Sequence, residues 1–242
     1  MSPESRAAHE ILAMLEATYQ PTHRFVPAHP RSFRHLDQRW YDRAARTLEQ
    51  RGFKRLGDLE DRTITEAGGV LSPAMIRTLR SSDGAVAVSL YHARIRSFPL
   101  RALFWVLRQL PGTIIDCETE CTDGSFVVTS TAPASTGALE MPALISSRFL
   151  PKGTTVESAV AQHEARITAH LAHRPGVTAR RVTTSEELIA MQNRLNALKS
   201  AYRGEIGGVT RDELDRLAPA WARGVAGDVH AAIEVEQWRR AS

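Results

Sequence analysis

IIDCETECTDGSFVVTSTA, residues 114–132, decides the fold class, because it reads as two strands joined at Asp123-Gly124. An Asp-Gly pair between two runs of strand-forming residues is a strong signal for a tight β-hairpin. Side chains alternate between the two faces of a strand, so both faces of the first run are readable. One face carries Ile115, Cys117, Thr119 and Cys121, and the other carries Ile114, Asp116, Glu118 and Glu120.

The segments before this hairpin extend it into a sheet. MIRTLRSSDGAVAVSLYHA, residues 75–93, repeats the hairpin signal at Asp83-Gly84, and GFKRLGDLED, residues 52–61, reads as a further strand. Together they predict a mostly antiparallel sheet of about five strands. An amphipathic helix that starts after Asp37 supplies an apolar face to cover it. We therefore expect residues 1–150 to form an α+β domain.

The remaining part of the chain, residues 151–242, is expected to be helical. Three Thr-x-x-Glu pairs mark helix starts of the capping-box type: Thr154 with Glu157, Thr184 with Glu187, and Thr210 with Glu213. In residues 155–173 and 185–203 the apolar positions alternate in spacings of three and four, which is typical of paired helices. This pattern predicts an antiparallel helix hairpin, in a region that forms a second domain or packs on the first as one unit.

Composition is that of an ordinary globular protein, with 242 residues, 43% hydrophobic and 24% charged. A net charge of +4 is too even a balance to indicate nucleic-acid binding, although the pI of about 9.4 leaves it open. The first residues are amphipathic and unlike a signal peptide, and no run reaches the roughly 20 apolar residues of a membrane span. A cytoplasmic bacterial protein is expected.

AQHEARITAHLAH, residues 161–173, resembles the start of a zinc-protease helix but lacks its spacing. That motif needs histidines at i and i+4, and here Ile167 follows His163 at that distance. His170 lies two turns on, about 10.5 Å along the helix axis. We therefore expect no metal site, and two histidines that face inward between paired helices. His163, His170 and His173 stay candidates for contacts with a ligand or partner.

Asp116, Glu118 and Glu120 form a carboxylate row on one strand face. Such a row is most often the solvated side of a sheet. If a helix covers it, burial raises the pKa values and the row becomes a candidate for acid–base catalysis. His92, beside Tyr91 on a predicted strand, is the further catalytic candidate, against the alternative of a core or surface histidine.

Two other stretches carry candidate binding residues. HRFVPAHPRSFRH, residues 23–35, offers Arg24, Arg31 and Arg34 to phosphates and phenylalanines for base stacking. The alternative, which we favour, is an arm that packs its aromatic rings and exposes its cations. SFPLRALFWVLRQLPG, residues 97–112, predicts an apolar helix with Trp105 as a candidate partner contact. Burial against a sheet or partner fits this helix better than a membrane surface.

Familiar catalytic motifs are missing from the sequence: it contains no Gly-x-Ser-x-Gly elbow, P-loop or Gly-x-Gly-x-x-Gly. No cofactor is expected. The first hypothesis is a non-catalytic protein that binds a small ligand, a partner protein or a second copy of itself. The second is a small-molecule enzyme built from His92 and the carboxylates at 116–120. The third is nucleic-acid binding through residues 23–35. A closed pocket around the carboxylates favours the enzyme, and a solvated carboxylate face argues against it.

Overall fold

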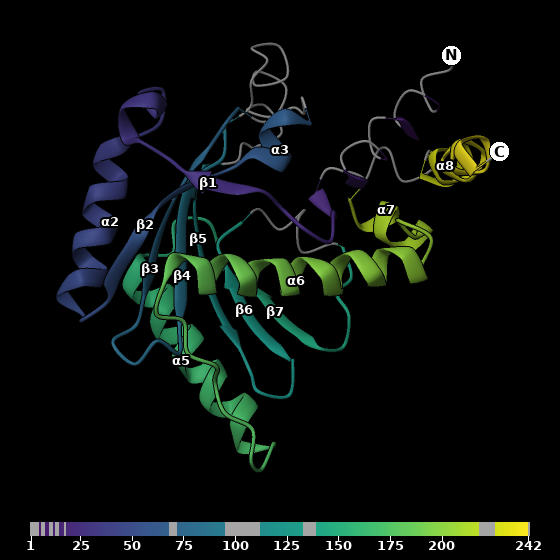
Figure 1. The fold of residues 1–242 in the computed structure, drawn as a ribbon. Coiled ribbons are helices and arrows are strands. Elements are labelled where there is room, and N and C mark those ends of the chain that lie inside the picture. Colours follow the sequence, from purple (N-terminus) through teal and green to yellow (C-terminus); the bar gives the residue numbers. More distant parts are fainter. Residues whose placement is uncertain are drawn as a thin grey trace.

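A seven-stranded sheet dominates the part of the chain that the structure, a computed structural model, describes (Figure 1). The described residues are 19–67, 72–94, 112–132, 139–217 and 226–241, with Ser5, Ala8, His9, Leu12, Leu15, Glu16 and Thr18. The strands lie in chain order across the sheet, and all neighbours are antiparallel except β6 and β7, which are parallel. Their bounds are Phe25–Pro27 (β1), Lys54–Asp61 (β2), Met75–Arg80 (β3), Ala87–His92 (β4), Thr113–Glu120 (β5), Phe126–Ser130 (β6) and Ile145–Phe149 (β7).

The α+β class and the mostly antiparallel sheet are confirmed, and the five predicted strands correspond to β2–β6. The two edge strands, β1 and β7, are absent from the prediction. β1 is three residues long and ends in a proline, inside a segment rich in proline and histidine. β7 reads ISSRF, which has no clear apolar alternation. Both strands form because the backbone of a neighbouring strand, β2 or β6, pairs with them through hydrogen bonds. No local sequence pattern shows that such a neighbour is present.

Two helices cover one face of the sheet. α2 (Gln38–Gln50) and α5 (Val156–Ala172) pack on this face against a cluster that includes Val88, Leu90, Ile115 and Cys117. Leu150, Val156 and Val160 belong to the same cluster, so residues on both sides of position 150 share one core. The division into two domains there stays a prediction.

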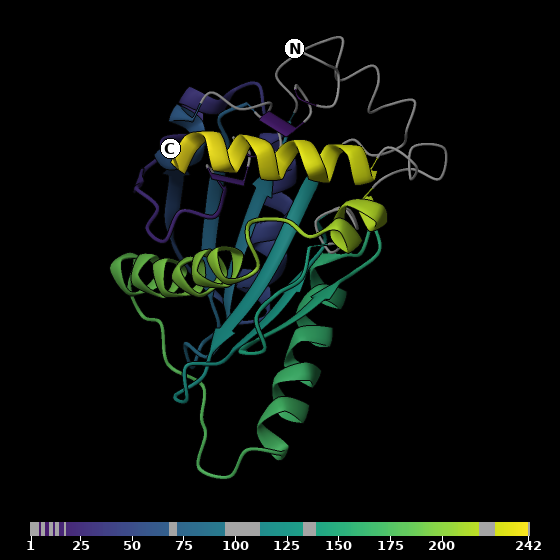
Figure 2. The same ribbon diagram turned by 90° about the vertical axis from the view of Figure 1, so that its right-hand side faces the viewer.

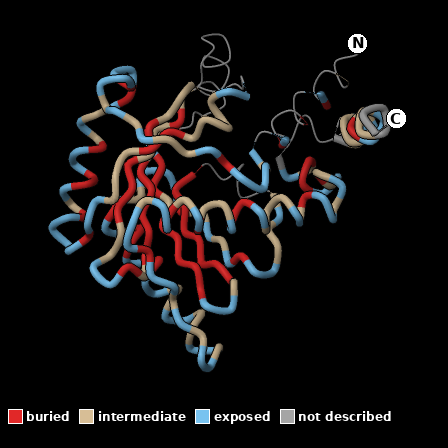
Figure 3. Tube along the Cα trace, viewed as in Figure 1, coloured by how far each residue is buried: buried red, intermediate tan, exposed pale blue. Residues whose placement is uncertain are grey.

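A third helix, α6 (Ser185–Glu205), crosses the opposite face of the sheet (Figures 1 and 2). Its Leu188, Met191 and Leu195 join a cluster with Ala87 and Phe126. The predicted antiparallel hairpin of residues 155–203 is therefore wrong, because α5 and α6 have the sheet between them. Each helix does bury an apolar stripe, but the covering surface is the sheet in both cases. Figure 3 shows the result, a buried central sheet flanked by helices with exposed outer sides.

The chain ends meet in a separate apolar cluster. Ala8, Leu12 and Leu15 pack with Val209 and with residues of two C-terminal helices, α7 (Arg211–Leu217) and α8 (Ala226–Ala241).

The capping boxes predicted at Thr184 and Thr210 are present, whereas α5 takes Thr155 as its cap in place of Thr154. Two shorter helices complete the described elements, η1 (Pro30–Phe33) and α3 (Arg62–Glu66). None of the described helices is long and apolar enough to cross a membrane.

Candidate functional site

A row of short polar side chains runs across the face of the sheet that α6 covers. Thr78, Ser89, Asp116 and Ser130 lie opposite one another on β3, β4, β5 and β6. Side chains of this size do not fill the space between a sheet and a helix, where layers usually lie about 10 Å apart. A cavity of about 370 Å³ remains above the row. It exists because the sequence places Ser and Thr at alternate positions where a packed core would have Leu, Ile or Val.

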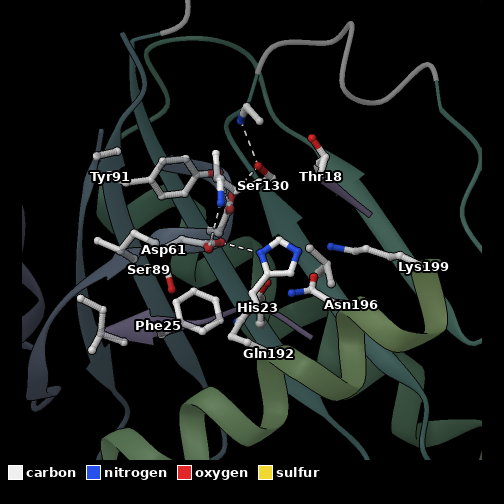
Figure 4. Close-up of a pocket in the computed structure, with 18 of the residues that line it drawn as sticks. Thr18, His23, Phe25, Asp61, Ser89, Tyr91, Ser130, Gln192, Asn196 and Lys199 are labelled. Atoms are coloured by element: carbon white, nitrogen blue, oxygen red, sulfur yellow. Dashed lines mark hydrogen bonds and ion pairs between the residues drawn. The ribbon is translucent and has the colours of Figure 1, made fainter. Parts of the chain in front are cut away.

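Several elements enclose this cavity (Figure 4). α6 lines one side with Leu188, Gln192, Asn196 and Lys199, which are spaced by three or four residues and so share one side of the helix. β1, β2 and α3 line another side, and β7 and Met141 a third. About half of the lining side chains are apolar, among them Phe25, Leu59, Ile76, Val128 and Ile145. Polar groups from the sheet, from α6 and from the segment before β1 therefore face the same space as these apolar side chains.

Asp116 lies at the centre of the polar row. Its carboxylate accepts hydrogen bonds from the Ser130 hydroxyl and, at 2.7 Å, from the Tyr91 hydroxyl. Burial raises the pKa of Asp116, and the two hydroxyls and the charge of Lys199 lower it only in part. Burial and the same carboxylate raise the pKa of Tyr91. Tyr91 therefore remains a protonated donor to Asp116.

Glu118 follows on the same face, two residues along β5. Its carboxylate accepts a hydrogen bond from the Gln192 amide of α6. Burial, followed by the charge of Asp116, raises the pKa of Glu118 to about 7. Lys199 lowers the pKa of both carboxylates through its charge, but it forms no ion pair with either. The cavity thus holds two adjacent acids, one of which exchanges its proton near neutral pH.

His23 and Asp61 form a second polar pair in the cavity wall. Nδ1 of His23 lies 2.6 Å from Oδ2 of Asp61, and the other Asp61 oxygen caps α3 by accepting from the Ile64 amide. The backbone amide of His23 donates to Asn193 of α6 at 2.9 Å, so the residue is held at both ends. Because a carboxylate accepts hydrogen bonds, the proton of the neutral ring lies on Nδ1 and Nε2 carries the lone pair. Nε2 is buried and has no hydrogen-bond partner among the described residues.

The carboxylate row was expected to be solvated, and this expectation is wrong. Glu118 and Glu120 are 6% and 3% exposed, because α6 covers their face of the sheet. His92, by contrast, is not part of this pocket. It alternates to the face covered by α2, where its Nδ1 accepts a 3.4 Å hydrogen bond from the Asp37 amide. The structure thus brings Asp116 and Glu118 together, and His23 is the histidine of the pocket.

Comparison of the chain with protein-family models, with curated proteins and with solved structures finds no match. The assignment of a function therefore rests on the geometry. Within the described part of the chain, no group of three or more His, Cys, Asp or Glu side chains is arranged to hold a metal ion. Cys117 and Cys121 are both free and buried.

The three histidines of α5 lie apart from the cavity. His163 is fully buried between the hydroxyls of Thr119 and Thr129, at 3.1 and 2.9 Å, and burial lowers its pKa to about 3. His170 contacts the Ser125 hydroxyl at 2.9 Å, and His173 is exposed at the end of α5. His163 contacts strands of the sheet, and His170 contacts the turn between β5 and β6, where a second helix was expected. A role in binding a ligand or partner stays a prediction for all three, and Trp105 lies outside the described residues.

The basic segment 23–35 packs its aromatic rings and exposes its cations, as the arm interpretation expects. Phe33 is buried in the core and Phe25 lines the cavity. Arg24, Arg31 and Arg34 are exposed, and Arg24 forms an ion pair with Glu66. Nucleic-acid binding by these arginines stays a prediction.

Sequence reasoning missed His23, Asp61, Tyr91 and Lys199 as members of one site. They come from four segments, and His23 and Asp61 are 38 residues apart. One usable signal was present: Thr78, Ser89 and Ser130 recur on the inward face of strands that otherwise carry large apolar residues. Small polar side chains that lie opposite one another on neighbouring strands leave a cavity above the sheet. A cavity beside buried acids is a candidate ligand site.

Proposed function

We propose that this chain binds a small organic molecule in the cavity between the sheet and α6. The observation that carries the proposal is the cavity itself, about 370 Å³, in which the polar row on the sheet faces apolar side chains of β1, β2, β7 and α6. Ligand pockets are concave, largely apolar and equipped with a few convergent polar groups, and they typically measure about 300–1,000 Å³. Of the alternatives raised by the sequence, a small ligand fits this feature better than a partner protein.

The polar groups in the cavity indicate that it is a binding site and not merely a packing defect. Protein interiors rarely leave voids larger than a water molecule, and an unfilled cavity costs stability in proportion to its volume. Here the cavity also exposes two acids whose ionisation is penalised by burial. Selection for stability alone would replace such groups with apolar residues, whereas a binding site needs them.

Filling the cavity tests this function. Ser89→Leu places an apolar side chain into the space above the polar row, so we expect the ligand-free protein to melt at the same or a higher temperature. The same variant is expected to lose ligand-induced stabilisation. The measurement is a thermal shift against a library of small metabolites, with wild type and variant side by side.

Ser158→Leu is the matched control, because Ser158 is exposed on α5, on the other face of the sheet. This variant should respond to ligands as wild type does. A ligand that stabilises Ser89→Leu as strongly as wild type would show that binding takes place elsewhere and would contradict the proposal.

A second function, proton-transfer catalysis, is favoured by one specific observation, the His23–Asp61 pair. A carboxylate that fixes Nδ1–H leaves Nε2 as the basic nitrogen, which is the arrangement of a general base. In this reading His23 takes a proton from the bound molecule, and Glu118, with its pKa of about 7, returns one. The test incubates each ligand found by thermal shift with wild type and with His23→Gln and follows its mass and deuterium content. Turnover that needs His23 supports catalysis, and an unchanged ligand argues for binding alone.

A further inference from the structure

We propose that the ligand of this cavity carries an ammonium group, which binds between the carboxylates of Asp116 and Glu118. The inference rests on the proposed function, and it names the chemical class of the ligand: a primary amine with an apolar body. It follows from how the carboxylates on β5 are paired and from an unpaired acceptor in the same cavity.

The hydrogen-bond partners of Asp116 and Glu118 are all neutral. Asp116 receives the hydroxyls of Tyr91 and Ser130, and Glu118 receives the amide of Gln192. No described Lys, Arg or His lies within ion-pair distance of either carboxylate, although both are enclosed by protein. Buried carboxylates are normally paired with a cation, whereas these two have, among the described residues, only the more distant charge of Lys199.

Glu120, the third member of the row, provides the internal comparison. It is buried as deeply as Glu118, but it binds Arg194 of α6 through two hydrogen bonds of 2.8 and 2.6 Å, with Arg180 at 3.5 Å. α6 therefore provides an arginine that pairs with Glu120. It provides no residue that forms an ion pair with Asp116 or Glu118, the two acids that line the cavity. Of the three, only Asp116 and Glu118 border the empty space.

His23 is the independent observation. Its side chain is 5% exposed, it lines the cavity, and its Nε2 has no partner among the described residues. In the neutral ring, with the proton on Nδ1 toward Asp61, Nε2 is an acceptor. In Figure 4 the ring lies between Asp61 on one side and Asn196 and Lys199 on the other. The cavity lining thus includes three acceptors, two carboxylates and the nitrogen of a neutral imidazole, and a primary ammonium has three N–H donors.

The other lining residues indicate the chemistry of the rest of the ligand. Phe25, Leu59 and Ile76 present hydrocarbon and one aromatic ring, and Phe25 also stacks on the His23 ring. Lys199 also lines the cavity, and in Figure 4 its side chain is directed toward the His23 ring, so an ammonium ligand shares the cavity with this charge. The occupant that matches these surfaces is an arylalkyl or alkyl amine.

Three probes that share a phenylethyl group and differ in charge test the inference: 2-phenylethylamine, 2-phenylethanol and 3-phenylpropanoate. Calorimetric titration at pH 8 should show that the amine binds at least about tenfold more tightly than the alcohol, with the carboxylate weakest. Asp116→Asn and Glu118→Gln should each remove at least about tenfold of the amine's affinity and leave that of the alcohol unchanged. The measured melting temperature of each variant establishes that it is folded.

Glu120→Gln is the matched control, because its carboxylate is already paired, and it should bind the amine as wild type does. Equal affinity for amine and alcohol, an equal loss in Glu120→Gln, or no binding of the amine overturns the ammonium inference. If the alcohol binds as well as the amine and Ser89→Leu abolishes both, the cavity is a ligand site for neutral molecules. In that case the proposed function holds and the inference alone fails.

Discussion

Glu118 and Glu120 are two residues apart, share a strand face and are both buried. The negative charge of Glu120 is compensated by a cation, whereas that of Glu118 has no cation among the described residues at ion-pair distance. Glu120 has the Arg194 guanidinium, whereas Glu118 has a neutral amide. A buried charge without a counter-charge destabilises the folded state, so the protein is stabilised by protonating Glu118. At the scale of single residues, the candidate site is the place where a buried acid lacks its partner.

The pH dependence of stability should reveal this acid. The folded pKa of Glu118 is about 7, above its ordinary value of 4.5, so the folded state holds an extra proton between these two values. Wild type therefore loses stability at this site as pH rises from 4.5 to 7, and the loss stays constant above that range. Glu118→Gln removes the titration. We expect the unfolding free energy of Glu118→Gln relative to wild type to increase by about 3 kcal/mol between pH 4 and 8.

Urea unfolding at a series of pH values measures this difference, and Glu120→Gln is the control. That variant loses charged hydrogen bonds with Arg194 and should be less stable than wild type at pH 8, by about 1–3 kcal/mol. A Glu118→Gln difference that does not change with pH would show that Glu118 does not titrate as stated.

At the scale of elements, the connection between α5 and α6 decides which face each helix covers. It passes the hairpin ends of the sheet: the Arg180 amide donates to the Glu120 carbonyl, and the Val182 amide donates to the Gly84 carbonyl. An amphipathic pattern identifies the buried side of a helix but not the surface that covers it. The alternating spacing in both helices therefore predicted mutual packing, although each packs on the sheet. This route places α6 over the carboxylate row and creates the cavity.

The two Asp-Gly turns look alike in the sequence, and the route of this connection makes them different. Gly84 and Gly124 both have a positive φ, +78° and +81°. A Cβ at Gly84 would lie 2.8 Å from the Val182 carbonyl oxygen, whereas one at Gly124 would meet nothing within 4 Å. Gly124→Ala should therefore cost about 1 kcal/mol from backbone strain alone. Gly84→Ala should cost clearly more, about 2–4 kcal/mol, because the chain leading to α6 must shift.

Chemical denaturation of both variants at one pH provides the comparison. Gly84→Ala should also weaken ligand binding, since the displaced segment leads directly into α6. Equal destabilisation by the two substitutions would mean that the contact between Gly84 and Val182 does not support the fold.

At the scale of the whole molecule, the two ends of the chain close one side of the structure near the cavity. Leu12 and Leu15 pack with Leu214 and Ile233, and beside them Arg203 and Glu213 form a buried ion pair at 2.7 Å. Tyr19 stacks under the Arg203 guanidinium and also lines the cavity. The C-terminal helices thus pack against the chain segment whose Tyr19 borders the cavity.

Removing a central side chain from this cluster should loosen the N-terminal segment. Ile233 is 1% exposed, so Ile233→Ala is expected to cost about 2–4 kcal/mol. Hydrogen exchange of the Leu12, Leu15 and Tyr19 amides should become faster, because the packing partner of these residues is gone. Val235→Ala, at a position that is 66% exposed on the same helix, should change neither quantity. Unchanged exchange in Ile233→Ala would show that the two ends are energetically independent.

The sequence by itself determined the local structure. Asp83-Gly84 and Asp123-Gly124 predicted two hairpins, and Thr184 with Glu187 predicted the start of α6, because turn and capping signals act within a few residues. The tertiary structure decided the rest: the edge strands β1 and β7, the opposite faces of α5 and α6, and the position of Asp116 and Glu118 beneath α6. Each of these depends on which surfaces meet in space. His23 and Asp61 form a pair for the same reason, because the sheet brings together groups that the sequence places 38 residues apart.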